Sequence, residues 1–298
     1  MPTPADLDAM RRAIIISASG LGTTSPNPPV GCVILNAESE IVGEGYHLYK
    51  GAPHAEVNAL AAAGVQATGG TAVVTLEPCN HVGLTPACHR ALLDAGIARV
   101  LIAVLDPTSR EEGGAERLRR AGVEVETHVL EGEALVVLGA WHASLASERP
   151  VLHVLHQVDA DGSLTAPSPE AVAETERQRQ THDLVICPEP TAAEEGRPGE
   201  HGLGVFHLPG ELPPDVAEAA VAKLAATGAR SVLLLGPSKL SSRLIDAGFV
   251  DRLTIFRPAP PPSRVGLRTP PLTLPPGFVL THVTRVGMQL LVTAEPRR

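Results

Sequence analysis

The first half of the chain alternates short apolar runs with stretches of helical periodicity. Apolar residues at helical spacing predict a helix over Asp6–Leu21, and the Ala-rich segment His54–Ala63 predicts another that ends at Gly64. Further helices are expected over Pro86–Ala95 and Ala115–Ala121, each closed by a glycine. Apolar or alternating runs predict strands at Val30–Leu35, Glu40–Gly45, Thr71–Leu76 and Val100–Leu105. Strands and helices that alternate in this way indicate a sheet covered by helices.

A second domain is predicted to begin at Glu148, because Pro150 cannot continue the helix before it. The two domains are therefore expected to be residues 1–147 and 148–298. In the second domain, apolar runs predict three strands and a helix, at Val151–Val158, Leu184–Cys187, Val232–Leu235 and Pro214–Thr227. The proline-rich residues 257–277 show no core pattern and predict a loop, after which Thr281–Val292 is expected to close the sheet.

Composition narrows the class of protein. A length of 298 residues suits two domains, and the hydrophobic fraction of 44% can bury two cores. The net charge of −9 lies almost wholly in the first half, and aromatic residues make up 2%, so a polynucleotide substrate is not expected. The longest apolar runs are too short to cross a bilayer, and the N-terminus does not resemble a signal peptide. A cytoplasmic location is expected, where the four cysteines favour metal binding or burial over disulfides.

Two short segments carry candidate chemistry. His54 begins a predicted helix, Cys79 directly follows a predicted strand, and Cys88 lies near the start of another helix. One imidazole and two thiolates are three zinc ligands, which leaves the fourth tetrahedral position for water, as in catalytic zinc sites. A helix N-terminus also favours the thiolate form of Cys88. The sequence therefore predicts Zn²⁺ as the cofactor.

Glu56 stands two residues after His54 and is predicted to be the catalytic acid and base. A carboxylate there can reach water on the metal without binding the metal itself, and can move its protons to a ring nitrogen and a departing amine. This is the arrangement of zinc-dependent base deaminases. Alternatives stay open: the thiols could be buried without metal, or the zinc could be purely structural. Cys32, within an apolar strand, is expected to be a core residue, and His89 to face solvent.

Longer motifs surround these residues, among them Thr24-Ser25-Pro26-Asn27-Pro28, PHAEVNAL at 53–60 and TLEPCNHVGLTPAC at 75–88. With them the chain resembles the bifunctional riboflavin-biosynthesis deaminase–reductase family over nearly all of residues 8–145. The resemblance implies a cytidine-deaminase-like three-layer α/β/α domain, followed by a shortened dihydrofolate-reductase-like α/β domain. It also implies deamination of a diaminopyrimidinone that carries a phosphoribosylamino group, and a homodimer. The substrate-binding residues that it implies are Asn27, His47, His81, Asp106, Thr108 and Leu84.

Three of these pocket residues also have a plainer interpretation. Asn27, between prolines, could be a turn residue, and His47 and His81 could be surface histidines. Leu84 stands where the family has arginine, Thr108 where it has asparagine, and residues 109–114 add two acids. Loss of a cation and gain of acids weaken the binding of a phosphate, so a less anionic relative of the riboflavin intermediate is expected as substrate.

The second half resembles the reductase half of the family at Arg149-Pro150, Asp161-Gly162 and Leu235-Gly236-Pro237. The positions that the family uses for function differ. Leu155 replaces an expected lysine, Asp159 replaces a serine, and prolines follow Cys187 where a glycine-rich turn is expected. Prolines remove the backbone N–H groups that cradle a phosphate. NADPH binding is therefore not expected, and the domain is predicted to be an inactive scaffold or dimerisation module. The alternative is that it binds another ligand.

The favoured function is hydrolytic deamination of a small aminopyrimidine. One alternative keeps both family activities, deaminase and NADPH-dependent reductase. A second, of another class, is a non-catalytic zinc-binding protein that assembles or regulates a pathway complex, and the presence of Glu56 argues against it. A nucleic-acid base deaminase is opposed by the acidic charge and scarce aromatic residues. No nucleic-acid or membrane partner is expected.

Overall fold

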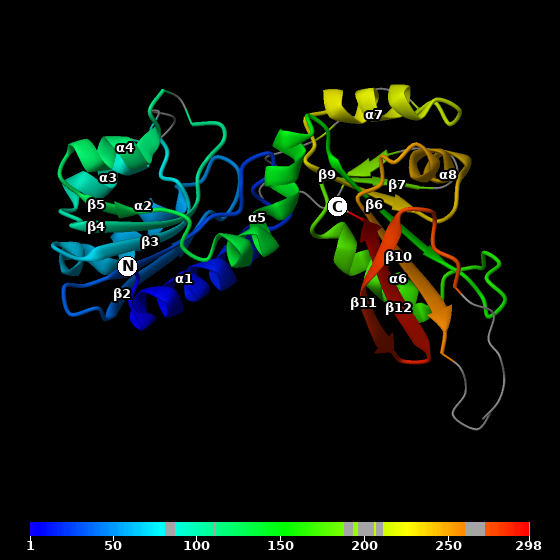
Figure 1. Cartoon of the computed structure of the whole chain (residues 1–298), viewed down its shortest axis with the longest axis horizontal. Coiled ribbons are helices and arrows are strands. Elements are labelled where there is room, and N and C mark those ends of the chain that lie inside the picture. The colour runs from blue at the N-terminus through cyan, green and yellow to red at the C-terminus, as the bar shows by residue number, and fades with distance from the viewer. Residues whose placement is uncertain are drawn as a thin grey trace. The chain divides into compact units, whose positions relative to one another are not determined.

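The computed structural model describes residues 1–80, 87–109, 111–187, 193–195, 206, 211–259 and 272–297. These residues form two compact units, of which the first is Met1–Leu145 and the second begins at Ala146. Each unit contains one β-sheet flanked by helices (Figure 1). Within the described ranges, no helix combines the length and the apolar character that crossing a membrane requires.

The sheet of the first unit has the strand order β2-β1-β3-β4-β5. β1 pairs antiparallel with β2 and with β3, whereas β3, β4 and β5 run parallel to one another. Parallel neighbours need long crossover connections, and the helices between these strands supply them. The strands are β1 (Gly31–Leu35), β2 (Ile41–Tyr46), β3 (Thr71–Leu76), β4 (Arg99–Val104) and β5 (Glu124–Glu126).

Helices cover both faces of this first sheet. α1 (Pro4–Ser17) and α5 (Glu131–Ala146) pack on one face, where Met10 and Trp141 join the core. The helices on the other face are α2 (Ala55–Ala63), α3 (Cys88–Asp94) and α4 (Gly113–Arg120). Short 3₁₀ helices follow α1 and α2, at Ala18–Gly20 and Gly64–Ala67. The predicted three-layer α/β/α arrangement is confirmed.

Helix α2 lies directly against strand β2, and two glycines make this possible. A Cβ atom at Gly43 would stand 2.3 Å from the carbonyl oxygen of Ala59, and one at Gly45 would stand 2.4 Å from the Ala59 nitrogen. Neither distance is sterically allowed, so no other residue fits at either position without moving the helix. The Ala-rich face of α2 completes the close contact, with Ala55, Ala59 and Ala63 all buried.

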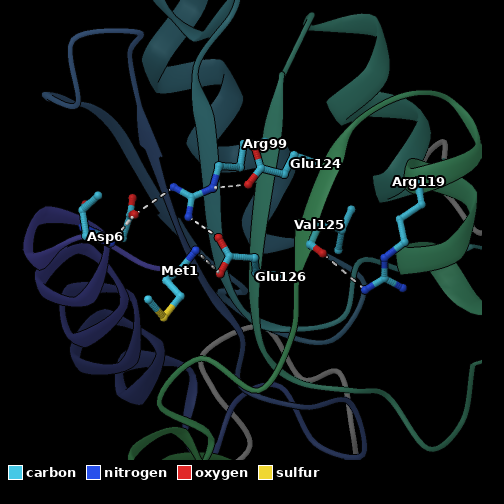
Figure 2. Close-up of polar contacts among 8 residues, drawn as sticks. Met1, Asp6, Arg99, Arg119, Glu124, Val125 and Glu126 are labelled. Atoms are coloured by element: carbon cyan, nitrogen blue, oxygen red, sulfur yellow. Dashed lines mark hydrogen bonds and ion pairs between the residues drawn. The ribbon is translucent and has the colours of Figure 1, made fainter.

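At the start of β4, the Arg99 side chain joins three elements (Figure 2). Its guanidinium donates to the buried Asp6 carboxylate at 2.8 Å, contacts Glu126, and lies 3.4 Å from Glu124. Asp6 also forms a capping box with Thr3 at the start of α1. These contacts fasten α1 to β4 and β5. They lie at the amino end of the parallel strands, opposite the carboxyl end that carries the predicted site.

The sheet of the second unit has the order β11-β12-β10-β6-β9-β7-β8 among the described residues. Its centre, β10-β6-β9-β7, is parallel, and antiparallel strands flank it on both sides. α7 (Ala217–Ala226) and α8 (Lys239–Asp246) pack on the main core, while α6 (Pro169–Arg179) contacts β6 and β9. The strands are β6 (Val151–Gln157), β7 (Leu184–Ile186), β8 (Ala193–Glu195), β9 (Ser231–Leu235), β10 (Arg252–Pro258), β11 (Phe278–Val286) and β12 (Gln289–Pro296).

The residues that carry the resemblance at the start of the second unit have a structural role. Arg149 makes a bidentate salt bridge with Asp251, with N···O distances of 2.7 and 2.9 Å. The same Asp251 carboxylate accepts the backbone N–H of Leu152 at 2.8 Å. Bidentate pairs fix the relative orientation of the two side chains and also stabilise the contact. The start of β6 is thereby tied to the segment that leads into β10.

Most predicted elements are confirmed, including β3 with its predicted bounds and the end of α2 at Gly64. Thr281–Val292 closes one edge of the sheet, as predicted, through the hairpin formed by β11 and β12. One expectation for the second unit is wrong. The proline-rich segment is not wholly a loop, because its first two residues belong to β10 and Leu272 and Leu274 pack on the core. Residues 260–271 of that segment lie outside the described residues.

A buried histidine on β6, His153, contacts a half-buried histidine just before β7, His182. Thr254 Oγ1 lies 2.8 Å from His153 Nε2, and His153 Nδ1 lies 3.3 Å from His182 Nε2. His182 Nδ1 lies 2.7 Å from the carbonyl oxygen of Gln178, so it must donate. This order of donors satisfies both rings in their neutral form. Burial, with Arg252 nearby, holds the pKa of His153 well below 6.5 and lowers that of His182 to about 4.

We predict that the stability of the second unit falls as the pH falls from 6.5 toward about 4. In this window the unfolded chain binds protons that the folded histidines do not, so protonation favours unfolding. The melting temperature should be highest above pH 6.5 and decline by several degrees below it. In the His182→Gln variant this decline should be shallower, whereas the same change at the exposed His128 should leave it as in the wild type. Equal slopes in all three proteins would contradict the prediction.

Candidate functional site

The three side chains predicted to hold zinc meet in the first unit. His54 is the N-cap residue of α2, Cys79 follows β3, and Cys88 is the first residue of α3. The Nδ1 atom of His54 lies 3.2 Å from Cys88 Sγ and 3.6 Å from Cys79 Sγ. All three candidate ligand atoms lie within 4.8 Å of one another. Segments far apart in the sequence therefore converge on one imidazole and two thiols.

This set of donors fits zinc by its chemistry. One imidazole nitrogen and two thiolate sulfurs are the ligands of one type of catalytic zinc site. The pKa of Cys79 is lowered to about 4, mainly because the Cys88 thiol donates a hydrogen bond to it and also because of His54. The backbone N–H of Cys88 adds a further donor, 3.2 Å from Cys79 Sγ. The hydrogen bond that the Cys88 thiol donates to Cys79, together with burial, raises the pKa of Cys88. The surroundings thus favour a thiolate at Cys79.

Glu56 is buried beside these ligands, with 3% of its surface exposed. Burial raises its pKa to about 7, although the nearby His54 opposes that shift. A hydrogen bond between its carboxyl group and Cys88 places it next to the predicted metal ligands. A carboxyl group that titrates near neutral pH can both accept and donate a proton. Position and acidity therefore suit Glu56 to proton transfer at this site.

Asn27 and His47 lie together next to His54. The Nδ1 atom of His47 lies 3.2 Å from the carbonyl oxygen of Pro53, so Nδ1 carries the proton and donates. The Nε2 atom then accepts from Asn27 Nδ2, at 3.4 Å. The rings of His47 and His54 meet edge to face, with centroids 5.3 Å apart. His47 is buried, so it is not the surface histidine of the plainer interpretation. A role for either residue in substrate binding stays a prediction.

His89 contacts the metal-binding segment, which the sequence did not indicate. We expected this residue to face solvent, but its Nδ1 atom lies 3.1 Å from the carbonyl oxygen of Cys79. Its backbone N–H also donates to that oxygen, at 3.3 Å. The start of α3 thus holds the Cys79 backbone through His89 and its sulfur through Cys88. A histidine immediately after a predicted ligand was the available signal.

The segment after β4 contains two more predicted substrate-binding residues. The Asp106 carboxylate accepts both the backbone N–H and the hydroxyl of Thr108, each at 2.7 Å. The backbone N–H of Asp106 donates to the carboxylate of Glu77, at 3.2 Å. Because Glu77 precedes Cys79 by two residues, this bond joins the segment to the metal-binding part of the chain. Whether Asp106 and Thr108 contact substrate stays a prediction.

The two acids that distinguish this segment are not isolated charges. Glu111 pairs with Arg117 at 2.7 Å, and Glu112 pairs with Arg120 at 3.1 Å. Both arginines belong to α4, which follows directly. Such pairs largely cancel the local negative charge that we expected to repel a phosphate group. The expected weakening of phosphate binding therefore depends on Leu84, which lies outside the described residues, as does His81.

Comparisons with known proteins identify both halves of the chain. The family described as the cytidine and deoxycytidylate deaminase zinc-binding region matches residues 4–104. The riboflavin biosynthesis protein RibD of Corynebacterium ammoniagenes is 35% identical over 295 residues, which cover 84% of this chain and 84% of that protein. RibD of Aquifex aeolicus is 44% identical over 160 residues, 53% of this chain, and the match spans 45% of that protein. The chain thus matches less than half the length of that relative.

A solved structure from Thermotoga maritima resembles the whole chain. It is described as a diaminohydroxyphosphoribosylaminopyrimidine deaminase and 5-amino-6-(5-phosphoribosylamino)uracil reductase. The TM-score is 0.78 at 25% identity, and the match covers 98% of this chain and 99% of that one. The second unit thus has a reductase-like fold, as expected, after the cytidine-deaminase-like first unit.

We predict that Cys88→Ser loses zinc while Cys32→Ala retains it. The wild type should hold roughly one zinc per chain after dialysis, since the three donors converge. Removing one thiolate should lower the content to almost none, measured by elemental analysis of the purified protein. Cys32 is the matched control, because it is fully buried but does not belong to the ligand group. Undiminished zinc in Cys88→Ser would show that the metal binds elsewhere.

Proposed function

This chain belongs to the RibD family of riboflavin biosynthesis proteins, and we propose that its first domain, residues 1–147, hydrolytically deaminates an aminopyrimidine. The proposed substrate is the diaminohydroxyphosphoribosylaminopyrimidine of riboflavin biosynthesis or a close relative. One observation carries the proposal: a buried carboxyl group, that of Glu56, lies against the ligand group of His54, Cys79 and Cys88. A purely structural zinc site has four protein ligands and needs no such acid.

The proposed reaction breaks the bond between a ring carbon and its amino group, forms a carbon–oxygen bond, and releases ammonia. Zinc, when held by the three ligands, supplies activated water as the nucleophile. Glu56 would accept one proton from that water and pass it to the ring nitrogen, and would then carry the remaining proton of the added hydroxyl to the departing amine. With a pKa of about 7, this carboxyl group can perform both transfers near neutral pH.

Asn27 and His47 are proposed to orient the pyrimidine ring over the metal site. Their support is geometric: the two side chains are hydrogen-bonded to each other, and the His47 ring meets that of His54. Side chains held in this way need little rearrangement when a ligand binds. Asp106 and Thr108, which are hydrogen-bonded to each other, are also proposed to contact the substrate. Because Glu111 and Glu112 are paired, we propose that a phosphorylated substrate is accepted.

The second domain, residues 148–298, is proposed to lack reductase activity. Leu155 stands where the resemblance calls for a lysine, and it is buried in an apolar cluster with Val185, Leu233 and Leu235. A side chain in that setting offers no charge or hydrogen bond to a cofactor or substrate. Asp159 replaces the expected serine, and its carboxylate accepts backbone N–H groups of its own turn. A bifunctional deaminase and NADPH-dependent reductase is the alternative.

A non-catalytic zinc protein is the alternative from another class. Such a protein gains nothing from a buried carboxyl group beside the metal ligands, because burying an acid costs stability. Glu56 therefore favours an enzyme. Homodimerisation and a cytoplasmic location stay predictions of the sequence.

We predict that Glu56→Gln lowers deamination by about 1000-fold without loss of zinc. The amide keeps the shape of the side chain but cannot take up the proton of water. Product formation from the diaminopyrimidine phosphate and from its dephosphorylated form should be followed by mass spectrometry. Glu116→Gln, an acid-to-amide change on the exposed side of α4, should react like the wild type. If the folded, zinc-loaded wild type turns over neither substrate, the assignment to this pyrimidine is wrong.

We also predict that NADPH is not consumed. In the same reaction with NADPH added, the deaminated pyrimidine should accumulate while the absorbance of the reduced nicotinamide stays constant. The reason is that Leu155 and Asp159 replace the polar groups expected at the reductase site. Oxidation of one NADPH for each deaminated molecule would establish the bifunctional alternative. A fluorescence titration would separate absence of cofactor binding from binding without turnover.

A further inference from the structure

Glu77 is a buried acid that the deamination chemistry does not use. It follows β3 directly, with 7% of its surface exposed, and precedes the predicted ligand Cys79 by two residues. Its own backbone N–H is bonded to the carbonyl oxygen of Val104, the last residue of β4, at 2.9 Å. A buried carboxylate costs free energy unless donors surround it, so its partners should reveal what it does.

Among the described residues, the three donors to the Glu77 carboxylate come from the segment after β4. We call residues 106–109 and 111–115 the Asp106 segment. Its first backbone N–H, that of Asp106, donates to Glu77 Oε2 at 3.2 Å, and the Ser109 hydroxyl donates to the same oxygen at 3.1 Å. The last backbone N–H, that of Ala115, donates to Oε1 at 2.9 Å. One carboxylate thus holds both ends of the segment.

Two glycines let the Asp106 segment come this close. A Cβ atom at Gly113 would stand 2.4 Å from Glu77 Oε1, and one at Gly114 would stand 1.8 Å from the carbonyl oxygen of Pro78. Gly113 also has a φ of 77°, in the region that disfavours other residues. The segment is therefore built to lie against the residues that lead into Cys79. Arg117 adds a longer contact, 3.5 Å from the carbonyl oxygen of Asn80.

We propose that Glu77 is a positioning residue, which locks the Asp106 segment onto the metal-binding part of the chain and so sets where Asp106 meets the substrate. The part of this proposal that concerns substrate rests on the proposed deaminase function. The Asp106 carboxylate is itself oriented by Thr108, so its place depends on how the segment is anchored. Among the described residues, we observe no contact between Glu77 and Glu56, and none between Glu77 and the donor atoms of the predicted metal ligands.

The negative charge of Glu77 is needed because its partners are fixed donors. Backbone N–H groups cannot reverse direction, whereas the Ser109 hydroxyl can. An amide at position 77 would turn an N–H group toward either Asp106 or Ala115, and one buried N–H would lose its acceptor. Glu77→Gln is therefore nearly the same shape but releases one end of the segment.

Hydrogen exchange tests the anchoring without reference to any substrate. In zinc-loaded Glu77→Gln, the amide of Asp106 or of Ala115 should exchange at least about tenfold faster than in the wild type. Gly113→Ala should have the same effect from the opposite side, because its methyl group would collide with the carboxylate. Gly122→Ala is the matched control: it has a similar φ of 89° at the other end of α4, but no atom lies within 4 Å of the added methyl group. Unchanged exchange of both amides in Glu77→Gln would overturn the proposal.

Steady-state kinetics test the consequence for substrate. Glu77→Gln and Gly113→Ala should raise KM for the diaminopyrimidine phosphate about tenfold, with a smaller change in kcat and with full zinc content. A variant that only loosens the fold would lose zinc and kcat together. An unchanged KM despite faster exchange would overturn the positioning role. If the wild type shows no deamination, the proposed function fails, while the exchange result still decides whether Glu77 anchors the segment.

Discussion

The position of the site depends on how closely α2 approaches β2. Side chains at Gly43 or Gly45 would push the helix outward, and His54 and Glu56, on its first turn, would move with it. The sulfur atoms that face them belong to other segments, after β3 and at the start of α3. Metal ligands and a proton-transfer group must be placed to within a fraction of an ångström. Two positions without side chains, neither of which takes part in the chemistry, therefore determine whether the three candidate ligand atoms can meet.

A second requirement is that negative charge be tolerated in a largely apolar setting. Cys79, Glu56 and Glu77 all lie in or near the interior, and each charged form needs donors there. The start of α3 serves the Cys79 sulfur through the N–H of Cys88, while both donors of His89 hold the Cys79 carbonyl oxygen. The Asp106 segment serves Glu77. These donors lower the free-energy cost of burying the charged groups. They also fix the backbone that carries the candidate ligands, so the same contacts both stabilise and position the site.

Local patterns predicted what depends on local residues. β3 is a run of apolar residues buried on both faces, and its bounds follow from composition alone. The His54, Glu56, Cys79 and Cys88 group was found because ligand chemistry restricts residue types and spacing. The roles of His89 and Glu77 depend instead on which segment the fold places beside them, and no periodicity encodes that. β5 was not predicted, for a related reason. Its three partly exposed residues form a strand only because β4 lies alongside them.

The fold of the second unit depends on contacts other than those at position 155, where the resemblance calls for a lysine. The Arg149–Asp251 pair and the apolar core of β6 and β9 hold the sheet in place, and they do not depend on what stands at position 155. On the face where a lysine is expected, Leu155 packs with its apolar neighbours, so the replacement adds buried surface rather than leaving an unpaired charge. Leu155 therefore contributes to the packing that joins β6 to β9 and β7, through Leu233 and Val185.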